Sequence, residues 1–195
     1  MAIRQYLAYL ITKGYSFPTT KPSKPFTLMV EVHDWSYFKI KDLFHVDLAT
    51  GDIKAGECLP GEIPLISSGT LNNGVVEYID EIGDGVSSIF GGNKITVDMF
   101  GQSFYQPDDF FSVSHGRVNV LNPYFDGFNN YHGLFVATVL NNEKYRFSYN
   151  RACYSGVIEE LEIKLPSLTN EHGETEVDWD FIEQFMKSLN YSNLI

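Results

Sequence analysis

Residues 61–75 read GEIPLISSGTLNNGV, and this stretch decides the fold because a strand, a turn and a second strand follow one another. Ile63–Ile66 is a short apolar run typical of a buried strand, and Val75–Ile79 is a second run of the same kind. The residues between them are polar, and Asn73-Gly74 is a pair typical of tight turns between strands. The stretch therefore predicts a β-hairpin.

More short strands are predicted on the carboxyl-terminal side of this hairpin. Apolar and β-branched segments separated by glycines predict strands at Lys94–Val97, Ser103–Tyr105, Phe110–Val113, Val118–Leu121 and Leu161–Leu165. Pro166 follows the last of these strands directly, so we expect the strand to end there. Residues 167–177 are polar and are expected to form a loop.

Apolar residues at a period near 3.6 predict helices around this β-rich region. We expect one helical turn at Ile40–Phe44, a longer helix from Tyr131 and a final helix from about Asp178. The apolar stripe of the final helix is composed of Trp179, Ile182, Phe185, Met186 and Leu189. The predicted class is α+β: a single β-rich domain with short strands and flanking amino- and carboxyl-terminal helices.

The first 25 residues differ from the rest of the chain. Ile3, Leu7, Leu10 and Ile11 fall on one helical face, and residues 17–25 have the Pro/Thr/Ser/Lys composition of a linker. We therefore expect a helix and linker over residues 1–25 and a globular domain over residues 26–195. The sequence has no run of roughly 18 apolar residues, and its two cysteines do not make a disulfide framework, so a cytoplasmic location is expected.

The charge of the chain is strongly negative, with a net value of −11. Acidic proteins repel polyanions, so this value opposes a role in nucleic-acid binding. The charge is unevenly distributed, however, because residues 155–195 contain nine acidic and two basic residues, whereas residues 115–151 have a net charge of +2. This distribution permits a less acidic face.

Three patterns imitate catalytic or metal sites without completing them. Asn122-Pro123-Tyr124 is similar to the Asn-Pro-Pro-Tyr motif of adenine methyltransferases but has one proline too few, and no glycine-rich cofactor loop accompanies it. Asp108 with Glu162 and Lys164 imitates a metal-nuclease pattern, but more than fifty residues separate its two parts. The histidines lack metal-ligand spacing; they are His33, His45, His115, His132 and His172.

A run from Trp35 to Leu189 resembles a known family, the target-recognition domain of type I restriction-modification specificity subunits. The same domain is appended to some single-chain type II restriction-modification enzymes. The segments that carry the likeness are residues 35–44, 61–75, 93–97, 103–107, 118–121, 143–151, 163–166 and the Asp178-Trp179 helix start. Each segment is weak alone, and their order and spacing are specific. The chain departs from the family at His115-Gly116-Arg117, where a pair of acids is usual, and in having one recognition domain.

The resemblance implies sequence-specific recognition of double-stranded DNA by a subunit without catalytic residues. It implies an adenine methyltransferase subunit as partner, and it leaves open a motor-nuclease subunit and a second copy of the chain as further partners. S-adenosylmethionine, Mg²⁺ and ATP are expected only in those partner subunits, with no cofactor or metal in this chain.

Polar and basic residues of the loops and turns are the expected DNA ligands. Asn and Gln pair with adenine and Arg with guanine in the major groove, whereas Lys and Arg also bind phosphates. The candidates are Ser67, Ser68, Thr70, Asn72, Asn73, Lys94, Gln102, Gln106, His115, Arg117, Asn119, Lys144, Arg146, Tyr149 and Arg151. Turn-forming, salt-bridging or packing roles remain the alternatives for these residues.

Two rival functions remain open at this point. An acidic module that binds a restriction complex without DNA, as a DNA mimic does, fits the net charge of −11. A divalent-metal nuclease requires Asp108, Glu162 and Lys164 to converge on one ion.

Overall fold

The hairpin predicted around Asn73-Gly74 is present in the structure, which is a computed structural model that describes residues 34–80, 82, 86–87, 89–113 and 118–189. Strand β3 (Pro60–Ile66) pairs antiparallel with β4 (Val75–Ile79) and parallel with β7 (Phe111–Ser112). These strands form a three-stranded sheet of order β4-β3-β7. The expected helix and linker at residues 1–25 lie outside the described residues.

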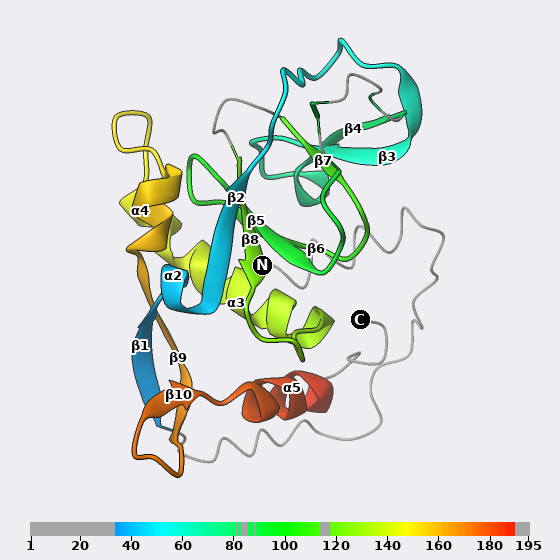
Figure 1. Cartoon of the computed structure of the whole chain (residues 1–195). Coiled ribbons are helices and arrows are strands. Elements are labelled where there is room, and N and C mark those ends of the chain that lie inside the picture. Colours follow the sequence, from blue (N-terminus) through cyan, green and yellow to red (C-terminus); the bar gives the residue numbers. More distant parts are fainter. Residues whose placement is uncertain (1–33, 81, 83–85, 88, 114–117, 190–195) are drawn as a thin grey trace.

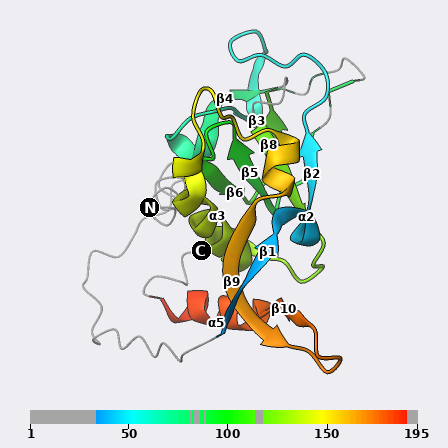
Figure 2. The same cartoon turned by 90° about the vertical axis from the view of Figure 1, so that its left-hand side faces the viewer.

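Two further sheets complete the β-rich body (Figure 1). The first is antiparallel with the order β2-β8-β5-β6 and contains β2 (Phe44–Leu48), β8 (Val118–Pro123), β5 (Lys94–Asp98) and β6 (Ser103–Gln106). The second has the order β1-β9-β10 and contains β1 (Trp35–Lys39), β9 (Glu162–Thr169) and β10 (Thr175–Val177). Figure 2 shows β1 running alongside β9.

Among the described residues, five helical elements accompany the sheets in addition to the η1 turn (Asn72–Gly74) between β3 and β4. They are α2 (Ile40–Leu43), α3 (Asn130–Glu143), η2 (Lys144–Arg146), α4 (Ser155–Glu159) and α5 (Trp179–Ser188). The Asp178 carboxylate accepts a hydrogen bond from the backbone N–H of Phe181 at 2.8 Å, which fixes the start of α5. The predicted turn at Ile40, the helix near Tyr131, the final helix and the α+β class are confirmed.

Strand β9 corrects two of the sequence-based expectations. It continues through Pro166 to Thr169, and a second strand, β10, returns within the segment expected to be a loop. Pro166 pairs with Trp35 of β1, whereas the next residue, Ser167, pairs with Val177 of β10. The Pro166 carbonyl oxygen accepts from the backbone N–H of Asp178 at 3.0 Å, whereas the N–H of Ser167 donates to the Asp34 carbonyl oxygen at 2.8 Å on the β1 side. The proline nitrogen therefore lies on the edge of β9 away from β1, just past the end of β10, where a missing N–H interrupts neither ladder.

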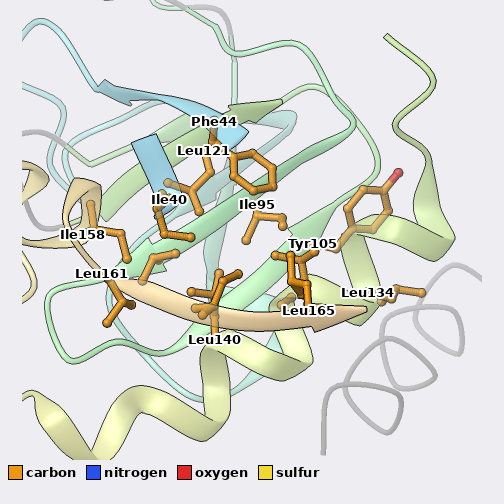
Figure 3. Packing of buried hydrophobic residues seen from close by; sticks show 14 of the residues in the cluster. Ile40, Phe44, Ile95, Tyr105, Leu121, Leu134, Leu140, Ile158, Leu161 and Leu165 are labelled. Carbon is orange, nitrogen blue, oxygen red and sulfur yellow. The ribbon is translucent and has the colours of Figure 1, made fainter. Parts of the chain in front are cut away.

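The core has two parts. The larger part lies between α3, α5 and strands of the two sheets that contain β5 and β9, and its buried side chains interdigitate in Figure 3. Ile95, Leu121 and Leu165 are 0% exposed there. The smaller part lies beneath the β3–β4 hairpin, where Leu65 and Phe110 are 0% exposed. The β3–β4 hairpin therefore packs on the rest of the domain through this smaller hydrophobic core.

His132 joins the amino-terminal ends of α3 and α5. Its Nδ1 accepts a hydrogen bond from the backbone N–H of Asn129 at 3.1 Å, and its Nε2 lies 2.9 Å from the carbonyl oxygen of Trp179. The imidazole is 1% exposed. Burial lowers the pKa of His132, an effect that Lys187 strengthens and that the Trp179 carbonyl, Glu183 and Asp180 oppose.

The lowered pKa predicts a loss of stability in weak acid. The unfolded chain binds a proton below the ordinary histidine pKa of about 6.5, whereas the folded chain keeps His132 neutral to lower pH. The contribution of His132 is thus complete above that value and is lost as the pH falls toward the folded pKa. The free energy of unfolding, measured with urea at about pH 7.5 and at about pH 5.5, should differ less between the two pH values in His132→Asn than in the wild type. Asparagine keeps an acceptor for the Asn129 N–H. Equal differences in both proteins would contradict this role.

Candidate nucleic-acid interface

Three chain segments meet at one surface, although they are distant in sequence. They are residues 67–72 of the β3–β4 connection, residues 99–102 of the β5–β6 turn, and residues 144–151 after α3; together we call them the loop surface. The backbone N–H of Gly69 donates to Asp98 Oδ2 at 3.2 Å, just before the β5–β6 turn. Lys144 Nζ donates to Gln102 Oε1 at 3.2 Å, and the rings of Phe100 and Tyr149 lie 6.4 Å apart.

Eight of the fifteen predicted DNA ligands belong to this loop surface and remain at least partly accessible. Thr70 and Asn72 are exposed in the β3–β4 connection, and the accessible candidates of all three segments are Ser67, Ser68, Thr70, Asn72, Lys144, Arg146, Tyr149 and Arg151. Hydroxyl and amide groups here supply both donors and acceptors, and Lys144 supplies positive charge. This is the mixture that base edges and phosphates require.

Exposed apolar groups of the loop surface, apart from Tyr149, are absent from the predicted set. Leu71 is 81% exposed, Tyr145 is 78% exposed and Tyr149 is 84% exposed, and Phe100 is also accessible. Aromatic rings at a nucleic-acid interface stack on bases or contact the thymine methyl group. Only Tyr149 was expected from the sequence, because no periodicity distinguishes an exposed aromatic residue in a turn from a buried one.

Arg146 and Arg151 lie beside acidic groups. Arg146 Nη1 is 3.4 Å from Glu143 Oε2, and both arginines line a hollow of about 220 Å³ that Glu160 and Glu162 also line. The carboxylate of Glu160 is itself bound to Lys39 and Lys41, which lower its pKa to about 2. Nearby carboxylates weaken phosphate binding by these two arginines.

Four of the predicted DNA ligands are buried in the structure. The exposed fractions are 3% for Asn73, 5% for Gln102, 4% for Gln106 and 0% for Asn119. Side chains with so little accessible surface are poorly placed to contact a base edge in this conformation. Their residue type was compatible with base recognition, but their environment is that of the protein interior.

These buried amides hold the loops in place. Asn73 Nδ2 donates to the Tyr105 carbonyl oxygen at 2.8 Å, and Gln106 Nε2 donates back to the Asn73 carbonyl oxygen at 3.0 Å, which ties the β3–β4 connection to β6. Asn119 Nδ2 donates to the Cys153 carbonyl oxygen at 2.8 Å. Gln102 Nε2 donates to Asn141 Oδ1 at 2.6 Å at the end of α3.

Lys94, one of the three remaining candidates, is not part of the loop surface. Lys94 begins β5, roughly 13 Å along the strand from Asp98 at the usual rise per residue, and its Nζ donates to Asn122 Oδ1 at 3.0 Å. His115 and Arg117 lie outside the described residues. The strand that follows them begins at Val118, which pairs with Asp98.

The described part of the chain contains no group of three His, Cys, Asp or Glu side chains that could hold a metal ion. Lys164 Nζ lies 5.9 Å from the centre of the Tyr37 ring on the β1-β9-β10 sheet, whereas Asp108 follows β6 of a different sheet. The carboxylate set of a metal nuclease is therefore not assembled among these residues. Within the same residues, no helix combines the length and apolar character needed to cross a membrane.

The sequence places the chain in a family of DNA specificity domains. A family model described as the type I restriction modification DNA specificity domain matches residues 32–194. The type II restriction enzyme specificity subunit S.BcgI of Heyndrickxia coagulans is 30% identical over 161 residues, which cover 80% of this chain and 43% of that protein. This chain belongs to the family of type I restriction modification DNA specificity domains.

The fold is shared with a solved structure at low sequence identity. The S subunit of a type I restriction-modification system from M. genitalium superposes with a TM-score of 0.53 at 12% identity, covering 82% of this chain and 38% of that one. The HsdS subunit from Thermoanaerobacter tengcongensis gives a TM-score of 0.49 at 9% identity, covering 99% and 44%. The chain spans less than half the length of these relatives.

Proposed function

We propose that this chain recognises a specific sequence in double-stranded DNA on behalf of a restriction-modification system. Membership of the DNA specificity family is the observation that carries the proposal. The loop surface supports it, because polar, cationic and aromatic side chains protrude there from a rigid β-rich body. Rigid strands that present variable loops are a common way to hold recognition side chains in place.

The loop surface provides for both kinds of DNA contact. Thr70 and Asn72 are exposed and offer hydrogen bonds to base edges in the major groove, and Tyr149 offers a ring for apolar contact. Lys144 supplies charge for a phosphate, which fixes register without sequence information. Sequence specificity is thus assigned to Thr70, Asn72 and Tyr149, and salt-dependent affinity to Lys144.

Part of the net charge of −11 lies away from the loop surface. Figure 1 shows the β9–β10 hairpin and α5 at the opposite end of the molecule from the β3–β4 hairpin. Exposed acids on and around those distal elements include Glu171, Glu174, Glu176 and Asp180. Phosphates are repelled from that end of the molecule.

Catalysis is proposed to reside in partner subunits. The partners are an adenine methyltransferase subunit, which uses S-adenosylmethionine, and a motor-nuclease subunit, which uses Mg²⁺ and ATP. A second copy of this chain would supply the other half of a two-part DNA target. In this arrangement the chain itself directs the chemistry and binds no cofactor.

DNA titrations at several salt concentrations test the proposal against the DNA-mimic alternative. The purified chain should bind a fluorescent duplex with an affinity that falls as salt rises, because phosphate contacts release counterions. Lys144→Ala should weaken binding to all sequences alike and reduce the salt slope by about 1. Lys164→Ala removes an equal charge from β9 and should leave both quantities unchanged. A DNA mimic would bind no duplex under any of these conditions.

A further inference from the structure

The carboxylate of Asp98 accepts hydrogen bonds from two of the three segments of the loop surface. Asp98 is the last residue of β5 and is 5% exposed. Its Oδ1 accepts from the backbone N–H groups of Phe100 at 2.8 Å and Gln102 at 2.9 Å, which shapes the β5–β6 turn. Its Oδ2 accepts from the backbone N–H of Gly69 at 3.2 Å, in the β3–β4 connection.

The third segment is connected to Asp98 through Gln102. Lys144 Nζ donates to Gln102 Oε1 at 3.2 Å, and the Lys144 charge also interacts favourably with the Asp98 carboxylate. Asn141 Oδ1 accepts from the backbone N–H of Ser103 at 3.0 Å, which holds the same turn against the end of α3. A displacement of the β5–β6 turn would therefore move all three segments relative to one another.

Only a carboxylate satisfies this arrangement. The three groups that face Asp98 are N–H donors, and an ionised carboxylate accepts on both oxygens. An amide of the same shape would point its own NH₂ group at either Gly69 or the turn, leaving two donors facing each other. Burial raises the pKa of Asp98, whereas the three backbone donors and Lys144 lower it.

We propose that Asp98 is a positioning residue for DNA recognition, which holds the β3–β4 connection in register with the β5–β6 turn before DNA binds. This inference rests on the proposed function. Asp98 itself is buried and touches no DNA. Its contribution is preorganisation: loops already fixed in their bound arrangement lose less conformational entropy on binding.

The test is Asp98→Asn, measured on two duplexes. One duplex carries the sequence that the wild-type chain enriches from a random pool, and the other carries the same bases scrambled. Affinity for the enriched duplex should fall about tenfold or more, as expected when one hydrogen bond to a charged group no longer orders a loop. Affinity for the scrambled duplex should not fall, because no phosphate ligand is removed.

Asp109→Asn is the matched control. Asp109 Oδ1 also accepts from a glycine backbone N–H, that of Gly92 at 2.9 Å, but it lies on an exposed loop outside the loop surface. This variant should keep wild-type affinity for both duplexes. Equal loss of affinity for both duplexes in Asp98→Asn, or no loss for either, would overturn the inference.

A second pair of variants covers the case in which Asp98→Asn fails to fold. Gly69→Pro removes the N–H that Asp98 accepts and leaves the β5–β6 turn intact, whereas Gly69→Ala keeps that N–H and places its Cβ in open space. Only the proline variant should lose discrimination between the duplexes; identical behaviour of the two variants would contradict the positioning role.

If the wild-type chain shows no preference for any duplex, the proposed function fails instead. Faster amide exchange at Gly69 in Asp98→Asn then still reports whether the carboxylate orders the loop.

Discussion

Asn73→Ala is expected to lower the free energy of unfolding by about 2–4 kcal/mol, from buried acceptors left without a donor and from the strain of alanine at positive φ. Asn73 has a φ of 56° and is 3% exposed. Its Nδ2 donates to the Tyr105 carbonyl oxygen at 2.8 Å and to Gln106 Oε1 at 3.2 Å. Urea unfolding followed by circular dichroism measures the loss.

Asn72→Ala provides the matched control for this prediction. Asn72 also has positive φ, at 47°, but its side chain is exposed and its one hydrogen bond, to the Val75 carbonyl oxygen, is long at 3.4 Å. The control should lose only the conformational part, about 1 kcal/mol. Equal losses at the two positions would mean that the buried hydrogen bonds of Asn73 contribute nothing measurable.

Gly133→Ala should destabilise the chain by about 1–3 kcal/mol, although alanine is the better helix former. Gly133 lies in the first half of α3, and a Cβ there would come within 2.1 Å of Tyr105 Cδ2 on β6. The tyrosine ring cannot move aside easily, because it is buried and its hydroxyl group donates to Asn93 Oδ1 at 3.0 Å. The glycine permits the close approach of α3 to the sheet.

Gly156→Ala makes the same change where there is room for it. Gly156 lies within α4, and a Cβ at this position meets nothing within 4 Å. Alanine should stabilise the chain there by about 0.5–1 kcal/mol through its helix propensity. Thermal unfolding of both variants should therefore give melting temperatures that shift in opposite directions. A stabilised Gly133→Ala would show that α3 is not in close contact with β6.

Elements with a clear local pattern were predicted, whereas a strand composed of polar residues was missed. The Asn73-Gly74 turn, the Val75–Ile79 strand and the helix after Asp178 follow from short patterns, and all three are confirmed. Strand β10 was taken for a loop because its residues are polar, and its pairing with β9 comes from the hairpin closed at Asn170 and Gly173. No local pattern announces such an exposed edge strand.

The predicted site residues include both exposed and buried side chains, because local sequence does not determine burial. A loop asparagine is compatible both with base recognition and with holding a turn, and sequence alone does not separate the exposed Asn72 from the buried Asn73. The alternation expected of β5 and β6 was hidden because both faces of these strands are buried, which places Gln106 inside. Gln102 is buried in the turn between the two strands. The role of Asp98 could not be predicted from the sequence, because its partners are the backbone N–H groups of Gly69, Phe100 and Gln102.

Selection from a random pool of DNA duplexes tests the central claim most directly. The purified chain is incubated with the pool at fixed salt, the bound duplexes are recovered and amplified, and the cycle is repeated before sequencing. The account predicts enrichment of one short sequence, and it predicts that Thr70→Ala with Asn72→Ala flattens the preference while binding to unselected DNA persists. A pool that is retained without enrichment of any sequence, or that is not retained at all, would contradict it.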